Sequence, residues 1–231
     1  MAKHGKKYRD VVEKVKRDAD YGIADAIRFL QENPTAKFDE TMELAFRMGV
    51  DPSKSDQAIR STVALPHGTG KDVRVIVFAS GDAAQAARDA GAAEVGMEEL
   101  IAKVQDGWTD FDAAVATPEA MKDVRKVARI LGPRGLMPNP KTGTVTDDVA
   151  SAVNQLKAGR VEFRMDRNGN VMVPFGKRSF ETEALLENAR SVIDAIHAAR
   201  PASAKGTYVK RATISSTMGP GLRVSLKEIS A

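Results

Sequence analysis

Apolar residues follow one pattern in the middle of this chain and another toward both of its ends. Between about residues 68 and 159, short and nearly continuous apolar runs such as VRVIVFA and AAVA alternate with helical stripes such as GDAAQAARDAGA. Continuous apolar strands are typical of parallel sheets that are buried on both faces. Strand and helix alternate three times, which predicts parallel strands joined by right-handed crossovers in a small Rossmann-like layer sandwich.

Toward both ends the pattern is that of half-buried elements. In TMELAFRM every second residue is apolar, at Met42, Leu44, Phe46 and Met48, as in a strand with one buried face. Amphipathic helices are predicted in GIADAIRFLQEN and TEALLENARSVIDAIHAAR. Later in the chain, VEFRMD and NVMVPFG flank the turn sequence DRNG and predict a β-hairpin, and YVKRATISST and GLRVSLKEI predict two more strands.

The similar ends and the different middle predict a discontinuous domain. We expect an α+β domain of residues 1–67 and 160–231, with an α/β Rossmann-like three-layer domain of residues 68–159 inserted into it. Of the 231 residues, 42% are hydrophobic and 29% charged, which supports packed cores and argues against collagen-like, coiled-coil or disordered chains. No apolar run reaches the length of a membrane helix, and no apolar stretch follows the basic residues at the N-terminus, so we expect neither membrane insertion nor export.

The absence of cysteine excludes disulfides, thiol catalysis and cysteine metal sites, and it fits a reducing cytoplasm. Charge is divided unequally between the two expected domains. Residues 68–159 contain 11 Lys and Arg against 13 Asp and Glu, a net charge of −2, and the remaining residues contain 24 against 18, a net charge of +6. The excess predicts that the split domain faces a polyanion such as nucleic acid, although a merely solvated basic face gives the same count.

Sequence signatures of enzymes are weak. In HGTGKD, Lys71 is followed by Asp72, whereas a phosphate-binding Walker loop needs Ser or Thr there, so this segment is interpreted as a hinge. The turn after VRVIVFA is SGD and lacks the G-x-G-x-x-G of dinucleotide sites. Asp110 and Asp112 are interpreted as turn and cap residues. We expect no catalytic residues, no cofactor and no metal site; the alternatives left open are a nucleotide-dependent enzyme built on the inserted α/β domain and a protein-interaction adaptor.

The segment GPRGLMPNPKTG is the most unusual loop of the sequence. Its glycines and prolines specify a stiff backbone, and Arg134 and Lys141 could contact phosphate. A rigid connector that packs Leu136 and Met137 onto a core explains the segment equally well.

The segment TISSTMGPG carries the residue types of an RNA contact. Ser215, Ser216 and Thr217 place hydroxyls at the end of a predicted strand, where they can bond ribose hydroxyls and base edges. Met218 offers a flat polarizable side chain, and Gly219 lets a nucleic-acid backbone approach because it has no Cβ. An ordinary junction between a strand and a turn is the alternative.

Seven segments taken in order carry a family resemblance: HGKKYR, TAKFDET, ALPHGTGKDVRV, DGWTDFDAAVATP, RILGPRGLMPNPKTGTV, KAGRVEFR and TISSTMGPG. Together they resemble the L-one family of bacterial large-subunit ribosomal proteins, essentially from end to end. The fold class that this resemblance implies is an α+β split RNA-binding domain with an inserted α/β Rossmann-like three-layer domain.

The resemblance also implies a function. Such a protein is a non-catalytic constituent of the large ribosomal subunit that binds large-subunit (23S) ribosomal RNA at the mobile stalk. It assists the movement and release of deacylated tRNA from the exit site, and it represses translation of its own operon mRNA. The implied partners are large-subunit ribosomal RNA, exit-site tRNA, the operon mRNA and the rest of the large ribosomal subunit, on ribosomes in the cytoplasm and away from membranes.

Carried over by position, the resemblance also names residues. Arg160, Lys177 and His4 are weaker candidates for RNA contact. The implied hinge lies at Pro66, His67, Gly68 and Gly159. The implied RNA-binding residues are Lys37, Phe38, Thr41, Arg164, Asp166, Ser216, Thr217, Met218 and Gly219.

Overall fold

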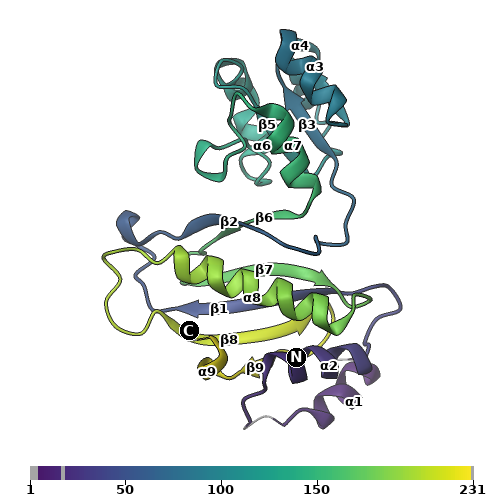
Figure 1. Ribbon diagram of the computed structural model, residues 1–231, viewed down its shortest axis with the longest axis vertical. Helices are drawn as coiled ribbons and strands as arrows, with labels where there is room; N and C mark the ends of the chain where they lie inside the picture. Colours follow the sequence, from purple (N-terminus) through teal and green to yellow (C-terminus); the bar gives the residue numbers. More distant parts are fainter. Residues whose placement is uncertain (1–4, 17–18, 230–231) are drawn as a thin grey trace. The chain divides into compact units, whose positions relative to one another are not determined.

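The computed structural model describes residues 5–16 and 19–229, which divide into two compact units (Figure 1). The first unit comprises the chain up to Gly70 together with the chain from Val161 onward, and the second comprises Lys71–Arg160. The protein is a mixed α/β protein with an antiparallel four-stranded sheet in the first unit and a parallel three-stranded sheet in the second.

The four-stranded sheet has the order β7-β1-β8-β9. Its central strand β1 (Thr41–Met48) is antiparallel to both neighbours, β7 (Asn170–Lys177) and β8 (Val209–Ser216), and β8 pairs with β9 (Leu222–Val224). The alternation predicted for β1 is confirmed, because its four apolar alternate residues are all buried. The other residues of β1 point to the opposite face of the sheet, which is called the open face below.

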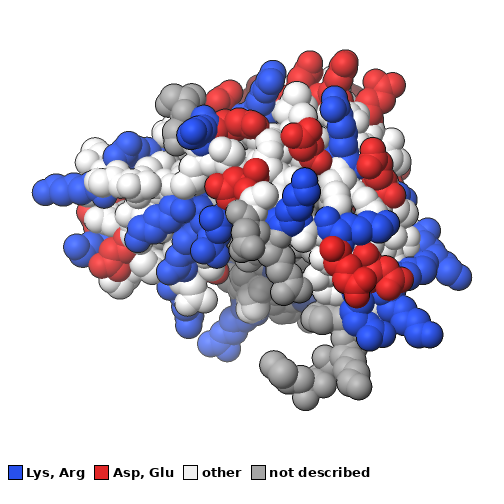
Figure 2. All heavy atoms as spheres, turned by 90° about the horizontal axis from the view of Figure 1, so that it is seen from below, with Lys and Arg blue, Asp and Glu red and all other residues white. Residues whose placement is uncertain are grey.

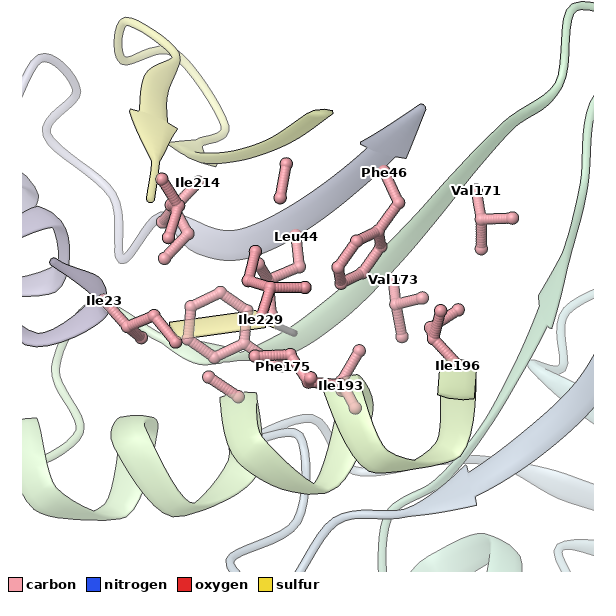
Figure 3. Close-up of a cluster of buried hydrophobic side chains, with 14 of the residues drawn as sticks. Ile23, Leu44, Phe46, Val171, Val173, Phe175, Ile193, Ile196, Ile214 and Ile229 are labelled. Atoms are coloured by element: carbon pink, nitrogen blue, oxygen red, sulfur yellow. The ribbon is translucent and has the colours of Figure 1, made fainter. Parts of the chain in front are cut away.

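Helices α2 (Ile23–Glu32) and α8 (Thr182–Ala198) pack against the buried face. Both were predicted from their amphipathic pattern. In Figure 3, side chains of β1 and β7 point toward those of α8, so that Phe46, Val173 and Ile196 fill the same layer. Short elements complete the first unit: α1 (Lys6–Lys14), the 3-10 turn η1 (Ser55–Gln57) and α9 (Leu226–Ile229).

The predicted hairpin around DRNG is wrong. The turn forms, since Asp166 accepts backbone hydrogen bonds from Asn168 and Asn170, but the flanking strands do not pair with each other. Instead β6 (Arg160–Arg164) pairs with β2 (Arg60–Ala64) in a separate two-stranded sheet, while β7 pairs with β1. Both strands pair with strands that lie more than 90 residues earlier in the sequence. The prediction compared only neighbouring segments.

The second unit has a parallel sheet of order β4-β3-β5, as the continuous apolar runs predicted. Its strands are β3 (Val75–Phe78), β4 (Glu94–Gly96) and β5 (Ala113–Ala116). Alternate residues of β3 enter two different cores: Val75 and Val77 pack against α3 (Gly81–Asp89) and α7 (Val149–Lys157), and Ile76 and Phe78 pack on the other side.

That other side is covered by α4 (Glu98–Gln105) and by a helical segment that is broken rather than continuous. The segment consists of α5 (Met121–Val124), a 3-10 turn η2 (Arg125–Val127) and α6 (Ala128–Leu131). The loop that follows contains the 3-10 turn η3 (Pro140–Thr142). Its Leu136 and Met137 pack against the core, which supports the interpretation as a rigid connector.

Candidate nucleic-acid interface

The start of β1 and the turn after β8 are joined by backbone and hydroxyl hydrogen bonds. Thr41 N donates to Thr217 Oγ1 at 3.0 Å, and Thr217 N donates to Thr41 O at 3.1 Å. Lys177, which faces Thr41 across the sheet, donates from Nζ to Thr41 Oγ1 at 2.9 Å. The antiparallel register therefore brings together three predicted residues that are far apart in the sequence.

Two large apolar side chains are exposed at this end of the sheet. Phe38 is 54% exposed and Met218 is 57% exposed, and among the described residues only Met172 is another large apolar side chain with comparable exposure. Asp39 accepts hydrogen bonds from Ser179 N at 3.1 Å and from Ser179 Oγ at 2.7 Å, which fixes the segment that carries Phe38 and the exposed Lys37. Apolar groups held on a rigid frame in contact with solvent are typical of a binding site.

A buried carboxylate supports this end of the sheet. Glu40 has no exposed surface, and it accepts hydrogen bonds from Thr35 Oγ1 at 2.9 Å, from Met218 N at 3.0 Å and from Ser216 Oγ at 3.3 Å. Burial alone would raise the pKa of Glu40, but the hydrogen bonds from Met218 and Thr35 outweigh it and the pKa is lowered. Glu40 is therefore an ionised anchor between two segments, and sequence reasoning missed it because nothing in AKFDET indicates burial.

Two residues predicted to contact RNA, Ser216 and Gly219, also have close contacts inside the protein. Ser216 is only 6% exposed, and its hydroxyl points to Glu40 rather than to solvent. The alternation along β8 could have predicted this burial, because Ser216 lies on the same face of the strand as the buried Ile214. A Cβ on Gly219 would lie 2.3 Å from Ser216 Oγ, so glycine is required there by close packing against Ser216.

The start of α1 lies beside the same turn. A hollow of about 590 Å³ is lined by Gly5, Lys6, Lys7, Tyr8, Thr35, Thr217, Met218 and Gly219. Its two lysines and its tyrosine were not among the predicted RNA-binding residues, although the segment HGKKYR contained the signal. His4, the weaker candidate of that segment, lies outside the described residues.

Arg164 and Asp166 lie at the other end of the sheet. Strand β1 runs from Thr41, paired with Lys177, to Arg47, paired with Asn170, a distance of roughly 20 Å at about 3.4 Å per residue. Asp166 belongs to the turn before β7, where the hydrogen bond from Asn170 N is the main cause that lowers its pKa. Asp166 thus shapes the turn, and the structure does not bring Arg164 or Asp166 together with Thr217.

The open face of the sheet connects the two ends. On it, Ala45 faces Met172 on one neighbour and Thr213 on the other. A hollow of about 560 Å³ is lined there by Ala45, Phe46, Arg47, Asn170, Met172, Lys210, Arg211 and Thr213. Sequence reasoning did not select these cations: Arg47 alternates with buried residues along β1, whereas Lys210 and Arg211 are consecutive exposed residues of β8. On the side of the molecule seen in Figure 2, basic and acidic side chains are interleaved over much of the surface. An anion on that side would therefore be attracted only at particular places.

The described residues contain no group of three or more His, Asp or Glu side chains that could hold a metal ion. None of their helices combines the length and apolar character needed to cross a bilayer. Comparison with known families matches residues 30–220 to the ribosomal protein L1p/L10e family, which is most of the chain. The chain belongs to the ribosomal protein L1p/L10e family.

This membership confirms the resemblance and excludes the nucleotide-dependent enzyme, because members of the L1p/L10e family are non-enzymatic ribosomal proteins. The protein is a structural RNA-binding protein of the large ribosomal subunit, and its partners are large-subunit ribosomal RNA and the ribosome.

In this L1p/L10e protein, part of the predicted hinge is fixed to the first unit. The buried Asn188 of α8 accepts a hydrogen bond from His67 N at 3.0 Å, and it donates to Gly68 O at 3.1 Å and to Phe175 O at 2.8 Å. His67 Nε2 also lies 2.6 Å from Glu187 Oε2. Pro66, His67 and Gly68 thus precede the boundary between the units at Gly70, and Gly159, with a φ of 103°, lies just before the boundary at Arg160.

Proposed function

We propose that the first unit recognises a structured site on large-subunit ribosomal RNA through the end of the sheet that carries Phe38, Thr41, Thr217 and Met218. The observation that carries the proposal is the pair of exposed apolar side chains held by a hydrogen-bonded frame. A Phe ring and a Met side chain can pack on a ribose or a base, and a strand-end hydroxyl can bond a 2′-hydroxyl. This end of the sheet is called the recognition site below.

Cations around the recognition site supply affinity for phosphate. Lys37 is exposed next to Phe38, and Lys6 and Lys7 line the hollow beside Met218. Contacts with phosphate position a protein on RNA without reading its sequence. Arg164, at the far end of the sheet, adds to this group in our proposal, whereas Ser216, Gly219 and Asp166 act indirectly by shaping the site and the DRNG turn.

We assign RNA binding to the discontinuous domain, residues 1–67 and 160–231, and treat residues 68–159 as a Rossmann-like insertion. The hinge between them is placed next to Gly70 and Gly159, because Asn188 holds His67 and Gly68 on α8. With such a hinge the protein would form part of the mobile stalk and accompany deacylated tRNA leaving the exit site. An operon mRNA that presents the same RNA shape would occupy the same recognition site and be repressed.

The test is a titration of the full-length protein against a large-subunit RNA stalk fragment and an unrelated hairpin of equal length. Met218→Asp, or Thr217→Ala, which also removes the hydroxyl that accepts from Thr41 N, should weaken binding to the stalk fragment by about 1–3 kcal/mol while the rest of the fold stays intact. Gln85→Glu, at an exposed position of α3, adds a negative charge elsewhere and should bind like the parent.

Equal binding by the parent and both variants would refute the recognition site. Equal affinity of the parent for the stalk fragment and the hairpin would reduce the first unit to a general polyanion binder. If the operon mRNA uses the same site, Thr217→Ala should weaken its binding and that of the stalk fragment by the same factor.

A further inference from the structure

Basic side chains of the second unit gather on one of its segments. Residues 121–141 contain six Lys or Arg and one Asp, a net charge of +5, while the rest of residues 68–159 contains five against 12, a net charge of −7. Solubility needs only interspersed charges of both signs, so it does not require this separation. The net charge of −2 over the whole region conceals a strongly basic surface.

Four of these cations form a stripe on the broken helix. Backbone angles are right-handed helical at Val124, Arg125 and Ala128 and depart from helical values at Val127, where φ is −99° and ψ is 7°, so two short helices and a 3-10 turn follow one another directly along the chain. Spacings of three and four residues place side chains on one helical face. The opposite face is fully buried in the core through Val124, Val127 and Leu131. The basic stripe, defined as Lys122, Arg125, Lys126 and Arg129, is therefore fixed in place by core packing.

Most of the stripe has no counter-charge. Lys126 pairs with Asp123 at 2.8 Å. Lys122, Arg125 and Arg129 are exposed, and their side chains make no hydrogen bond or ion pair with any described residue. Three uncompensated cations on a rigid face favour an external anion as their partner.

The loop after the stripe presents two more cations on an ordered backbone. Asn139 accepts a hydrogen bond from Lys141 N at 2.8 Å, and Asn139 N donates to Thr144 Oγ1 at 2.8 Å. Arg134 is exposed and donates to Thr109 Oγ1. Arg134 and Lys141 are thus held on a backbone that is stiff before any ligand binds.

The residue types on this surface indicate which kind of partner it binds. Protein interfaces depend on apolar or aromatic anchors, but the large exposed apolar side chains of the described residues, Phe38, Met172 and Met218, all belong to the first unit. A helix that binds a membrane surface needs a free apolar face, and here that face is buried. Cations without such anchors suit phosphates along a nucleic-acid backbone.

We propose that the basic stripe, together with Arg134 and Lys141, binds the phosphate backbone of an RNA helix without regard to sequence. The inserted unit then carries a second RNA contact, separate from the recognition site of the first unit. This contact adds affinity that depends steeply on salt and adds no sequence preference.

The test compares two triple variants of the full-length protein. K122Q/R125Q/R129Q removes the unpaired cations of the stripe, and K71Q/R88Q/K103Q removes the same charge from other positions of the second unit. Both are titrated against a 16-base-pair RNA duplex of arbitrary sequence over a range of salt concentrations. At roughly 0.7–0.9 per phosphate contact, the stripe variant should lower the slope of log K against log salt by about 2, and the control variant should leave it unchanged.

A second measurement locates the contact directly. Acetylation of lysines followed by mass spectrometry should show that the duplex protects Lys122 and leaves Lys103 reactive. Equal slopes for the two triple variants with Lys122 unprotected would overturn the proposal, as would loss of poly-glutamate binding in the stripe variant with unchanged RNA binding. The proposal for the recognition site is tested separately: it fails if Thr217→Ala keeps the full preference of the parent for the stalk fragment.

Discussion

Glu40→Gln tests whether a buried, ionised carboxylate holds the recognition site together. Glu40 Oε1 accepts three hydrogen bonds, from Thr35 Oγ1, Met218 N and Ser216 Oγ, and Oε2 accepts one from Thr35 N at 3.3 Å. A glutamine can keep its oxygen toward the three donors, but its amide group then faces Thr35 N, which is left without an acceptor. One unsatisfied buried donor costs about 1–3 kcal/mol, and the three bonds that remain are weakened by loss of the charge. We expect Glu40→Gln to lower the free energy of unfolding by about 2–3 kcal/mol.

The pH dependence of this loss follows from the lowered pKa of Glu40. A carboxyl whose pKa is lower in the folded state stabilises the protein above its unfolded pKa, near 4.5, and this stabilisation is lost as the pH falls through the folded value. The gap in stability between the parent and Glu40→Gln should therefore be largest near neutral pH and should shrink below about pH 4.5.

Urea unfolding at a series of pH values measures both effects, and Glu43→Gln is the matched control. Glu43 lies on the same strand, points to the open face and loses the same charge without a buried network. A gap that is absent at neutral pH, or that stays constant down to pH 3, would refute the role of Glu40 as an ionised anchor.

Three further changes test other contacts. Gly219→Ala should destabilise the protein by about 1–3 kcal/mol, because its Cβ would meet Ser216 Oγ. Thermal unfolding should show a smaller cost of Gly219→Ala when Ser216→Ala is also present, and additive effects of the two changes would argue against that contact. Asn188→Ala should cost about 2–4 kcal/mol and speed amide exchange at His67, since a buried amide that clamps three backbone groups is lost; unchanged exchange would mean that the clamp is not Asn188. Replacing residues 68–159 with a short linker should leave a folded protein that still prefers the stalk fragment in the RNA titration, with reduced salt dependence; a folded product without this preference would place recognition in the insertion.

Local patterns in the sequence predicted the helices and strands well, and the pairing of strands less well. The alternation in β1 and the continuous apolar run of β3 were sufficient because each reports burial on one or both faces of a sheet. The hairpin around DRNG failed because turn residues fix only a local bend, whereas β6 and β7 pair with strands from the first third of the chain. The helical segment after β5 is interrupted by a 3-10 turn that leaves the apolar spacing intact, so the sequence pattern does not reveal the break.

The residues of the candidate site were selected by family resemblance and, in TISSTMGPG, also by residue type, and neither shows in which direction a side chain points. Thr217 and Met218 are exposed, as a contact with RNA requires, but Ser216 points inward to Glu40. That carboxylate escaped notice because its burial depends on two segments, around Thr35–Glu40 and Ser216–Met218, that meet only in the folded protein. The sequence also does not give distances along the sheet, so Arg164 was grouped with residues at the opposite end of β1.

The order of synthesis has a consequence for how the four-stranded sheet forms. Strand β1 leaves the ribosome early, but both of its neighbours come from beyond residue 169, so roughly 6–24 s pass at 5–20 residues per second before β7 follows β1. During that interval the second unit, whose parallel strands lie within about 40 residues of one another, can fold on its own. The nascent chain must therefore carry an unpaired, half-apolar strand past a finished unit. Until the C-terminal segment arrives, the lone strand is exposed to chaperones and to aggregation.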